Sequence, residues 1–228
     1  MALRALRPPE VEDALAMGES LPFAGFLVRR ARGTYSVDRW GLDLDVVRAL
    51  TPLLRARFVI ERSGFEPLGD GPAMIVFNRR IGFVEQLILT SAVNRSVGRI
   101  PRFVGVPDVA PIGPILRSLG GVLDRPDEVA GLLRAGELVS VGLMNEWVDR
   151  HHAGILSPEA VTPALNAGVP VGPAAVIGHE FGFRWKVVCG EPVEPSPHHE
   201  PLAATRLAER SRDAVQELLD EHQSARWL

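Results

Sequence analysis

The amino-acid sequence predicts an α/β fold in which helices flank a central mixed, largely parallel sheet. Short apolar segments typical of strands alternate with segments of helical periodicity along most of the chain, and this order is typical of a sheet covered by helices. Apolar residues make up 46% of the 228 residues, which is enough for one sizeable core. We expect a single α/β domain over residues 45–228, preceded by a helical arm over residues 1–44.

The arm contains a short predicted helix over 10–17 and then an apolar run, 23–28, followed by a basic run, 29–32. An apolar run next to a basic one suits a segment that rests on an anionic membrane surface. The alternative is an arm docked on the core with a solvated basic end. The sequence leaves both interpretations open.

Composition narrows the classes of function. The net charge of −3 argues against a nucleic-acid partner, and the lone Cys189 excludes an intrachain disulfide and fits a reducing compartment. Cys189 lies in an apolar stretch, so we expect an inert core thiol. No run approaches the roughly 20 apolar residues that span a bilayer, and the first residues lack a signal-peptide core. We expect a cytoplasmic protein, with peripheral contact at the inner face of the membrane as an option.

The domain begins with a helix that Asp45 is expected to cap and that Pro52 is expected to kink or divide. An alternating strand follows over 57–62. The next elements are a strand over 73–77, a polar corner, and a helix over 83–97. In an α/β protein such a corner is the carboxyl end of a strand meeting a helix N-terminus, where backbone N–H groups favour anions.

The remaining elements are justified by the same signals. Pro126 suits the first turn of a helix, Gly136 suits its end, and Ser157 suits an N-cap. The last helix is amphipathic, with Leu207 and Leu218 assigned to its apolar face together with Ala214 and His222. The predicted strands are 102–106, 122–125, 138–143, 169–177 and 185–189, and the predicted helices are 112–119, 127–134, 157–166 and 201–222.

The stretch 70–85, Asp-Gly-Pro-Ala-Met-Ile-Val-Phe-Asn-Arg-Arg-Ile-Gly-Phe-Val-Glu, resembles the first signature of the glycerolipid acyltransferases. In that family a Gly-Pro pair, an apolar strand and an Asn-His pair lead into His-x4-Asp. The segment 120–125 is similar to the second signature and keeps its phosphate-contacting Arg125. The lead-in 132–139 and the Val-Pro-Val-Gly-Pro segment 169–173 also match, so the resemblance covers roughly residues 37–195.

The chemical positions depart from the family pattern. Aligned on Asn78, the catalytic His and Asp positions hold Arg79 and Val84; shifted by one residue, they hold Arg80 and Glu85. The third signature, usually Phe-Pro-Glu-Gly-Thr-Arg, is replaced over 142–147, where Glu146 lies two residues late. The resemblance therefore implies the fold more directly than the activity.

In the family the His is similar to a general base that takes a proton from a glycerol hydroxyl attacking an acyl thioester. A guanidinium, with a pKa above about 12, is effectively never deprotonated and cannot replace that base. Two arginines at this corner suit a phosphate instead. The resemblance thus implies a lysophospholipid- or glycerol-phosphate-acyltransferase-like protein that binds a phospholipid, a lysophospholipid or acyl-CoA, with catalysis lost or weak. The ligand-binding candidates are Asn78, Arg79, Arg80, Arg125 and Glu146.

Alternatives remain open. Arg80 and Glu85, at the family's His and Asp positions, are the catalytic candidates, or they form only a surface ion pair worth about 0–1 kcal/mol. An active enzyme with a rearranged site would use His179 or Glu85 as its base. We expect no metal and no cofactor, with acyl-CoA or acyl carrier protein as the acyl donor.

Overall fold

A computed structural model of the chain describes residue 33 and residues 37–69, 71–80, 83–144, 152–179, 181–196 and 201–223. The predicted arm, including its helix over 10–17, lies almost wholly outside these residues, as does Glu146. The boundary at residues 44 and 45 therefore stays a prediction.

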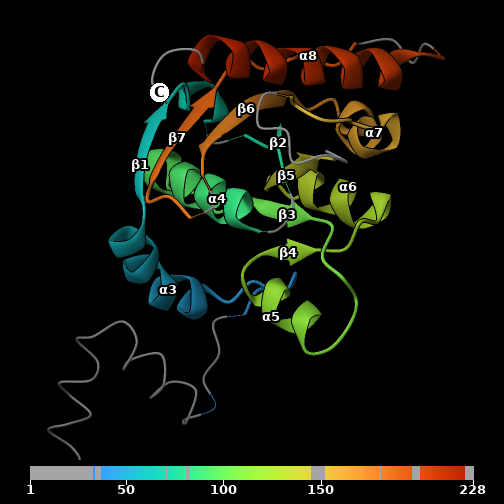
Figure 1. Cartoon of the computed structure of the whole chain (residues 1–228). Helices are drawn as coiled ribbons and strands as arrows, with labels where there is room; N and C mark the ends of the chain where they lie inside the picture. Colours follow the sequence, from blue (N-terminus) through green and yellow to red (C-terminus); the bar gives the residue numbers. More distant parts are fainter. Residues whose placement is uncertain are drawn as a thin grey trace, which may run out of the picture.

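One seven-stranded sheet forms the centre of the molecule, with the order β1-β7-β6-β2-β5-β3-β4 (Figure 1). Every neighbouring pair is parallel except β6 and β7, so the predicted mixed, largely parallel sheet is confirmed. The strands are β1 (Val59–Ser63), β2 (Ala73–Asn78), β3 (Arg102–Val104), β4 (Gly121–Val122), β5 (Leu138–Leu143), β6 (Val171–Gly178) and β7 (Arg184–Cys189).

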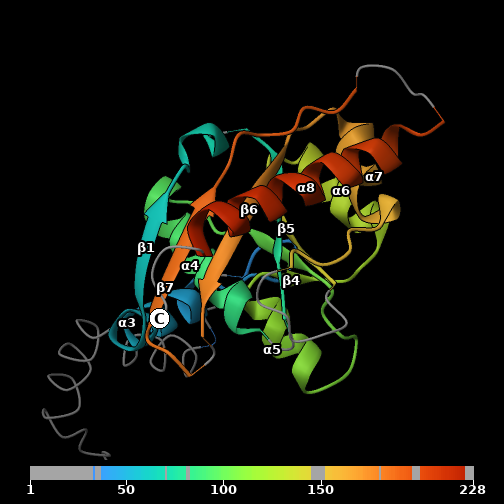
Figure 2. The same ribbon diagram turned by 45° about the horizontal axis from the view of Figure 1, so that its top comes forward.

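Helices cover both faces of this sheet. One face packs on α4, and the other packs on α6, α7 and α8; Figure 2 shows α8 lying across β6. Alternation along β2 places Met74 and Val76 in the core on the side of α6, α7 and α8, and Ile75 and Phe77 in the core on the side of α4. The helices are α3 (Leu44–Arg57), α4 (Val84–Val97), α5 (Ile112–Ser118), α6 (Pro126–Arg134), α7 (Pro158–Ala167) and α8 (Ala203–Gln223), with a short 3₁₀ turn, η1, at Glu66–Leu68.

The predicted cap of the first helix was wrong. The N-cap of α3 is Asp43, whose side chain accepts from the backbone N–H groups of Asp45 and Val46. Pro52 lies inside α3 and does not divide it, since the helix runs unbroken from Leu44 to Arg57; the kink at Pro52 stays a prediction. Ser157 does cap α7, as predicted, by accepting from the N–H of Ala160.

The apolar face of α8 also differs from the prediction. Its buried residues include Leu207, Ser211, Val215 and Leu219, whereas Ala214, Leu218 and His222 are half-buried. The buried positions Val215 and Leu219 each follow a predicted one by one residue, and the polar Ser211 among them makes this face look less apolar in the sequence. No described helix is both long enough and apolar enough to cross a bilayer.

Candidate functional site

The candidate site lies where β2, β3, β5 and β6 all end at one edge of the sheet. A cavity of about 180 Å³ opens there, on the side covered by α6 and α7. Apolar side chains dominate its lining, with Arg79, Asp124 and Glu159 as the charged members. Among the described residues, the apolar lining residues are Val104, Pro126, Val129, Val141, Met144, Ile155, Leu156, Ala160 and Pro163. The volume is below the roughly 300–1,000 Å³ of pockets for drug-sized ligands, so the cavity has room for part of such a ligand.

Asn78, the last residue of β2, binds backbone rather than facing this cavity. Its amide nitrogen donates to the carbonyl of Val176 at 2.9 Å, and its oxygen accepts from the N–H of Val176 at 2.7 Å. The side chain thereby continues the hydrogen-bond ladder between β2 and β6 and fixes the point where the chain leaves β2. Asn78 thereby fixes the position of the two arginines that follow it.

Arg79 is the arginine that lines the cavity. Its guanidinium lies over the ring of Phe83 at 5.1 Å. The stem of Arg79 crosses β5 at Gly142, where a Cβ would stand 2.6 Å from Cδ and 2.9 Å from Cβ of Arg79. Only a glycine at position 142 therefore leaves room for this arginine.

Arg80 and Glu85 form an ion pair inside the protein, with Nε of Arg80 2.7 Å from Oε1 of Glu85. Arg80 is 7% exposed and Glu85 is fully buried. The ion pair expected as an alternative therefore exists, but it is buried and does not lie on the surface. Arg80 also donates to the carbonyl of Gly178 at 3.2 Å and lies over Trp185. The shifted register, Arg80-x4-Glu85, is thus the one whose two side chains touch.

The other candidates are not brought together at the cavity. Arg125 is the exposed N-cap residue of α6, between two cavity-lining residues, Asp124 and Pro126. His179 is exposed just after β6, where Nδ1 accepts from the N–H of Phe181. The ligand-binding role of Arg125 stays a prediction, and so does a catalytic role for His179.

Sequence reasoning missed two carboxylates, Asp124 and Glu159, and the glycine that seats Arg79. Asp124 directly precedes the recognised Arg125, so a closer reading of the second signature could have included it. Glu159 lies in the first turn of α7, where a carboxylate favours the helix dipole in any helix and gives no specific signal. Among the described residues, no three metal-ligating side chains lie together.

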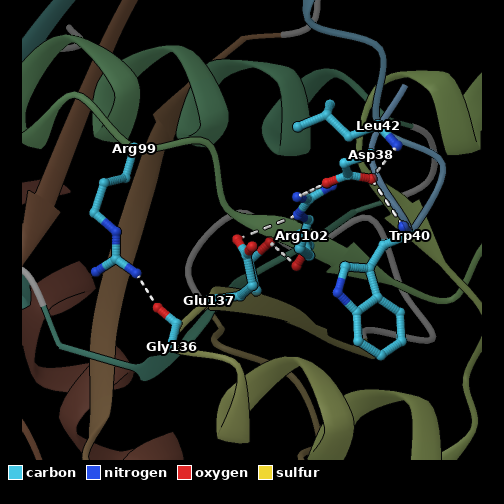
Figure 3. A network of polar contacts seen from close by, with 8 residues as sticks. Asp38, Trp40, Leu42, Arg99, Arg102, Gly136 and Glu137 are labelled. Atoms are coloured by element: carbon cyan, nitrogen blue, oxygen red, sulfur yellow. Dashed lines mark hydrogen bonds and ion pairs between the residues drawn. The ribbon is translucent and has the colours of Figure 1, made fainter. Parts of the chain in front are cut away.

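A buried arginine at the opposite end of β3 helps to hold the sheet behind the site. Arg102 binds Asp38 and approaches Glu137 at 3.5 Å, and Asp38 accepts from the N–H groups of Trp40 and Leu42 (Figure 3). Burial tends to raise the pKa of Asp38, but the hydrogen bond and charge of Arg102 and the two backbone donors together lower it. The segment before α3 is thereby fastened to the sheet.

The fold resembles the crystal structure of the 1-acyl-sn-glycerophosphate (LPA) acyltransferase PlsC from Thermotoga maritima, with a TM-score of 0.63 over 94% of this chain and 93% of that one. The two chains share a fold. Their sequence identity is 19%, so the likeness establishes the α/β acyltransferase fold and not the substrate.

No family model matches the chain. The uncharacterized proteins Rv0502 of Mycobacterium tuberculosis and Mb0514 of Mycobacterium bovis are each 32% identical over 176 residues, which cover 69% of this chain. The uncharacterized protein ML2427 of Mycobacterium leprae is 30% identical over the same length. The chain spans about half the length of these relatives.

Proposed function

We propose that this protein binds a ligand that carries both a phosphate and an acyl chain, a lysophospholipid, a phospholipid or acyl-CoA, and that it transfers acyl groups weakly or not at all. The observation that supports the proposal most is the position of Arg79, which lines an apolar cavity in an acyltransferase fold. The cavity takes apolar groups of the ligand and Arg79 contacts the phosphate.

The loss of catalysis follows from the residues at the two family registers. Arg79 and Arg80 cannot accept a proton near neutral pH, and losing a positioned acid/base group costs about 10² to 10⁴ in rate. Glu85, the alternative base, is fully buried against Arg80, so it does not reach a substrate hydroxyl. We therefore treat the family's catalytic motif as degenerate in this chain.

The proposal includes a cytoplasmic location, at the inner face of the membrane where such lipids are found. It rests on the lone Cys189 and on the sequence of the arm.

The test separates the two halves of the ligand. Lysophosphatidate has a phosphate and an acyl chain, glycerol 3-phosphate lacks the chain, and monoacylglycerol lacks the phosphate. Equilibrium binding of all three would be measured, below their micelle concentrations, for the natural protein, Arg79→Gln, Ala160→Leu and a control, Arg134→Gln, on the exposed side of α6.

We expect Arg79→Gln to weaken lysophosphatidate and glycerol 3-phosphate by about tenfold to a hundredfold, as for a lost charge-assisted hydrogen bond, and to leave monoacylglycerol unchanged. Ala160→Leu, which fills part of the cavity, should weaken only the two acyl ligands. Arg134→Gln should change none of the three. Equal affinities in all four proteins would refute the proposed site.

A further inference from the structure

The loop between β6 and β7, residues 179–183, displays two aromatic side chains to solvent. Phe181 is 86% exposed and Phe183 is 59% exposed, and Val59, the first residue of β1, is also 59% exposed. Single exposed apolar residues are ordinary, but neighbouring exposed phenylalanines mark a surface that meets an apolar partner.

Hydrogen bonds to the backbone of the loop fix its position. Arg57, at the end of α3, donates to the carbonyl of Gly182 at 3.0 Å and to that of Phe181 at 3.1 Å. The N–H of Val59 donates to the carbonyl of Phe183 at 2.7 Å. The two phenylalanines therefore project from a loop that is tied to α3 and β1.

Two arginines lie at the loop. Arg184 lies over the ring of Phe183, and Arg57 holds the loop itself. Farther along β1, Arg62 donates to Ser96 of α4. Arg62 and Arg55 also lie near Arg95: burial first, and then the charges of Arg62 and Arg55, lower the pKa of Arg95.

None of these five arginines forms an ion pair with a carboxylate in the part of the chain that the structure describes. The one acidic residue of β1 is Glu61, which lies beside Lys186 of β7, and Glu180 of the loop is outside the described residues. A locally basic surface on a chain of net charge −3 favours an anionic partner.

We propose that Phe181, Phe183, Val59, Arg57 and Arg184, together the hairpin surface, bind the surface of an anionic phospholipid bilayer. The two rings enter the boundary between headgroups and acyl chains, and the arginines contact lipid phosphates. The loop begins beside the candidate site, since Arg80 donates to the carbonyl of Gly178, so docking brings this edge of the sheet toward the lipid. This inference is independent of the ligand proposed for the cavity.

Co-sedimentation with vesicles tests the inference on the full chain. One set of vesicles contains equal parts of phosphatidylglycerol and phosphatidylcholine, and the other contains phosphatidylcholine only. The variants are Phe181→Ser/Phe183→Ser and Arg184→Gln, and the controls are Leu202→Ser, at an exposed apolar residue before α8, and Arg134→Gln. Circular dichroism and sedimentation velocity on each protein show that it is folded and report its oligomeric state.

The natural protein should bind the phosphatidylglycerol vesicles and lose binding as salt is raised. The double phenylalanine variant should bind about tenfold more weakly or worse, because each inserted ring buries a large apolar area. The Arg184→Gln variant should bind about fivefold more weakly, and the controls should match the natural protein.

Three results would overturn the inference. Binding that is the same in the phenylalanine variant would place membrane contact elsewhere, such as in the arm. Equal binding to both kinds of vesicle would remove the role of charge. A dimer that dissociates in the phenylalanine variant, without any vesicle binding, would assign the hairpin surface to a second copy of the chain.

Discussion

The ion pair between Arg80 and Glu85 allows a sharp prediction, because its burial decides how much it matters. An exposed pair contributes about 0–1 kcal/mol, whereas removing one partner of a buried pair typically costs about 3–5 kcal/mol. Glu85 is fully buried and Arg80 nearly so. Glu85→Gln should therefore lower the free energy of unfolding by about 3–5 kcal/mol, a large part of the roughly 5–15 kcal/mol of a typical domain.

Replacing both partners should cost much less. One carboxylate oxygen of Glu85, Oε2, has no hydrogen-bond partner among the described groups, so the pair is only partly satisfied. Arg80→Met/Glu85→Met removes both charges together and should recover most of the loss, as buried pairs often do when apolar residues replace them. A double-mutant cycle gives the coupling energy directly.

Urea unfolding monitored by tryptophan fluorescence would measure each free energy. The matched control is the exposed pair of Arg212 and Asp213, which are 2.8 Å apart, and Asp213→Asn there should change stability by less than about 1 kcal/mol. A cost below about 1 kcal/mol for Glu85→Gln, equal to that control, would show that water reaches the pair and would refute the reasoning.

Three further predictions follow from other parts of the structure. Asp38→Asn should lower the free energy of unfolding by about 1–3 kcal/mol, since it removes a charged partner of the buried Arg102. Because folding lowers the pKa of Asp38, this contribution is present above about pH 4 and is lost as the pH falls through the folded pKa. Urea unfolding should therefore show that the free energies of the natural protein and the variant converge in acid. Burial, and then the charge of Glu66, raise the pKa of Cys189 to about 12. A thiol reagent at pH 8 should therefore label Cys189 only when the protein unfolds, and fast labelling of the native protein would contradict this. The contribution of the raised pKa to stability is present below about pH 9 and is lost as the pH rises toward 12. Gly142→Ala should displace Arg79 and weaken lysophosphatidate binding about as much as Arg79→Gln does. Unchanged affinity in a binding titration would contradict the close packing of Arg79 against Gly142.

Much of the fold was predictable from local signals. The apolar strand at β2 and the Ser157 cap of α7 carry their signals in adjacent residues, and the structure confirms both. The cap of α3 was harder, because Asp43 and Asp45 both suit an N-cap and only the backbone conformation selects between them.

The site was less predictable, because it depends on side-chain directions. Arg79 and Arg80 are neighbours with the same chemistry, yet one lines a cavity and the other is buried against Glu85. The residues around Gly142 do not show that a glycine is needed there. The need arises only because β2 and β5 pair, which brings Arg79 against Gly142. The exposed aromatic loop likewise gave no signal, since Phe181 and Phe183 fit a strand as well as a surface.

The most direct test of the whole account is a single assay of thiol release from palmitoyl-CoA, with lysophosphatidate or glycerol 3-phosphate as acceptor, run beside equilibrium binding of the same ligands. We expect saturable binding that depends on Arg79, without acceptor-dependent thiol release, because Arg79 and Arg80 cannot accept a proton and Glu85 is buried against Arg80. Release that requires the acceptor would contradict the account and show that another group, such as His179 or a cavity carboxylate, acts as the base.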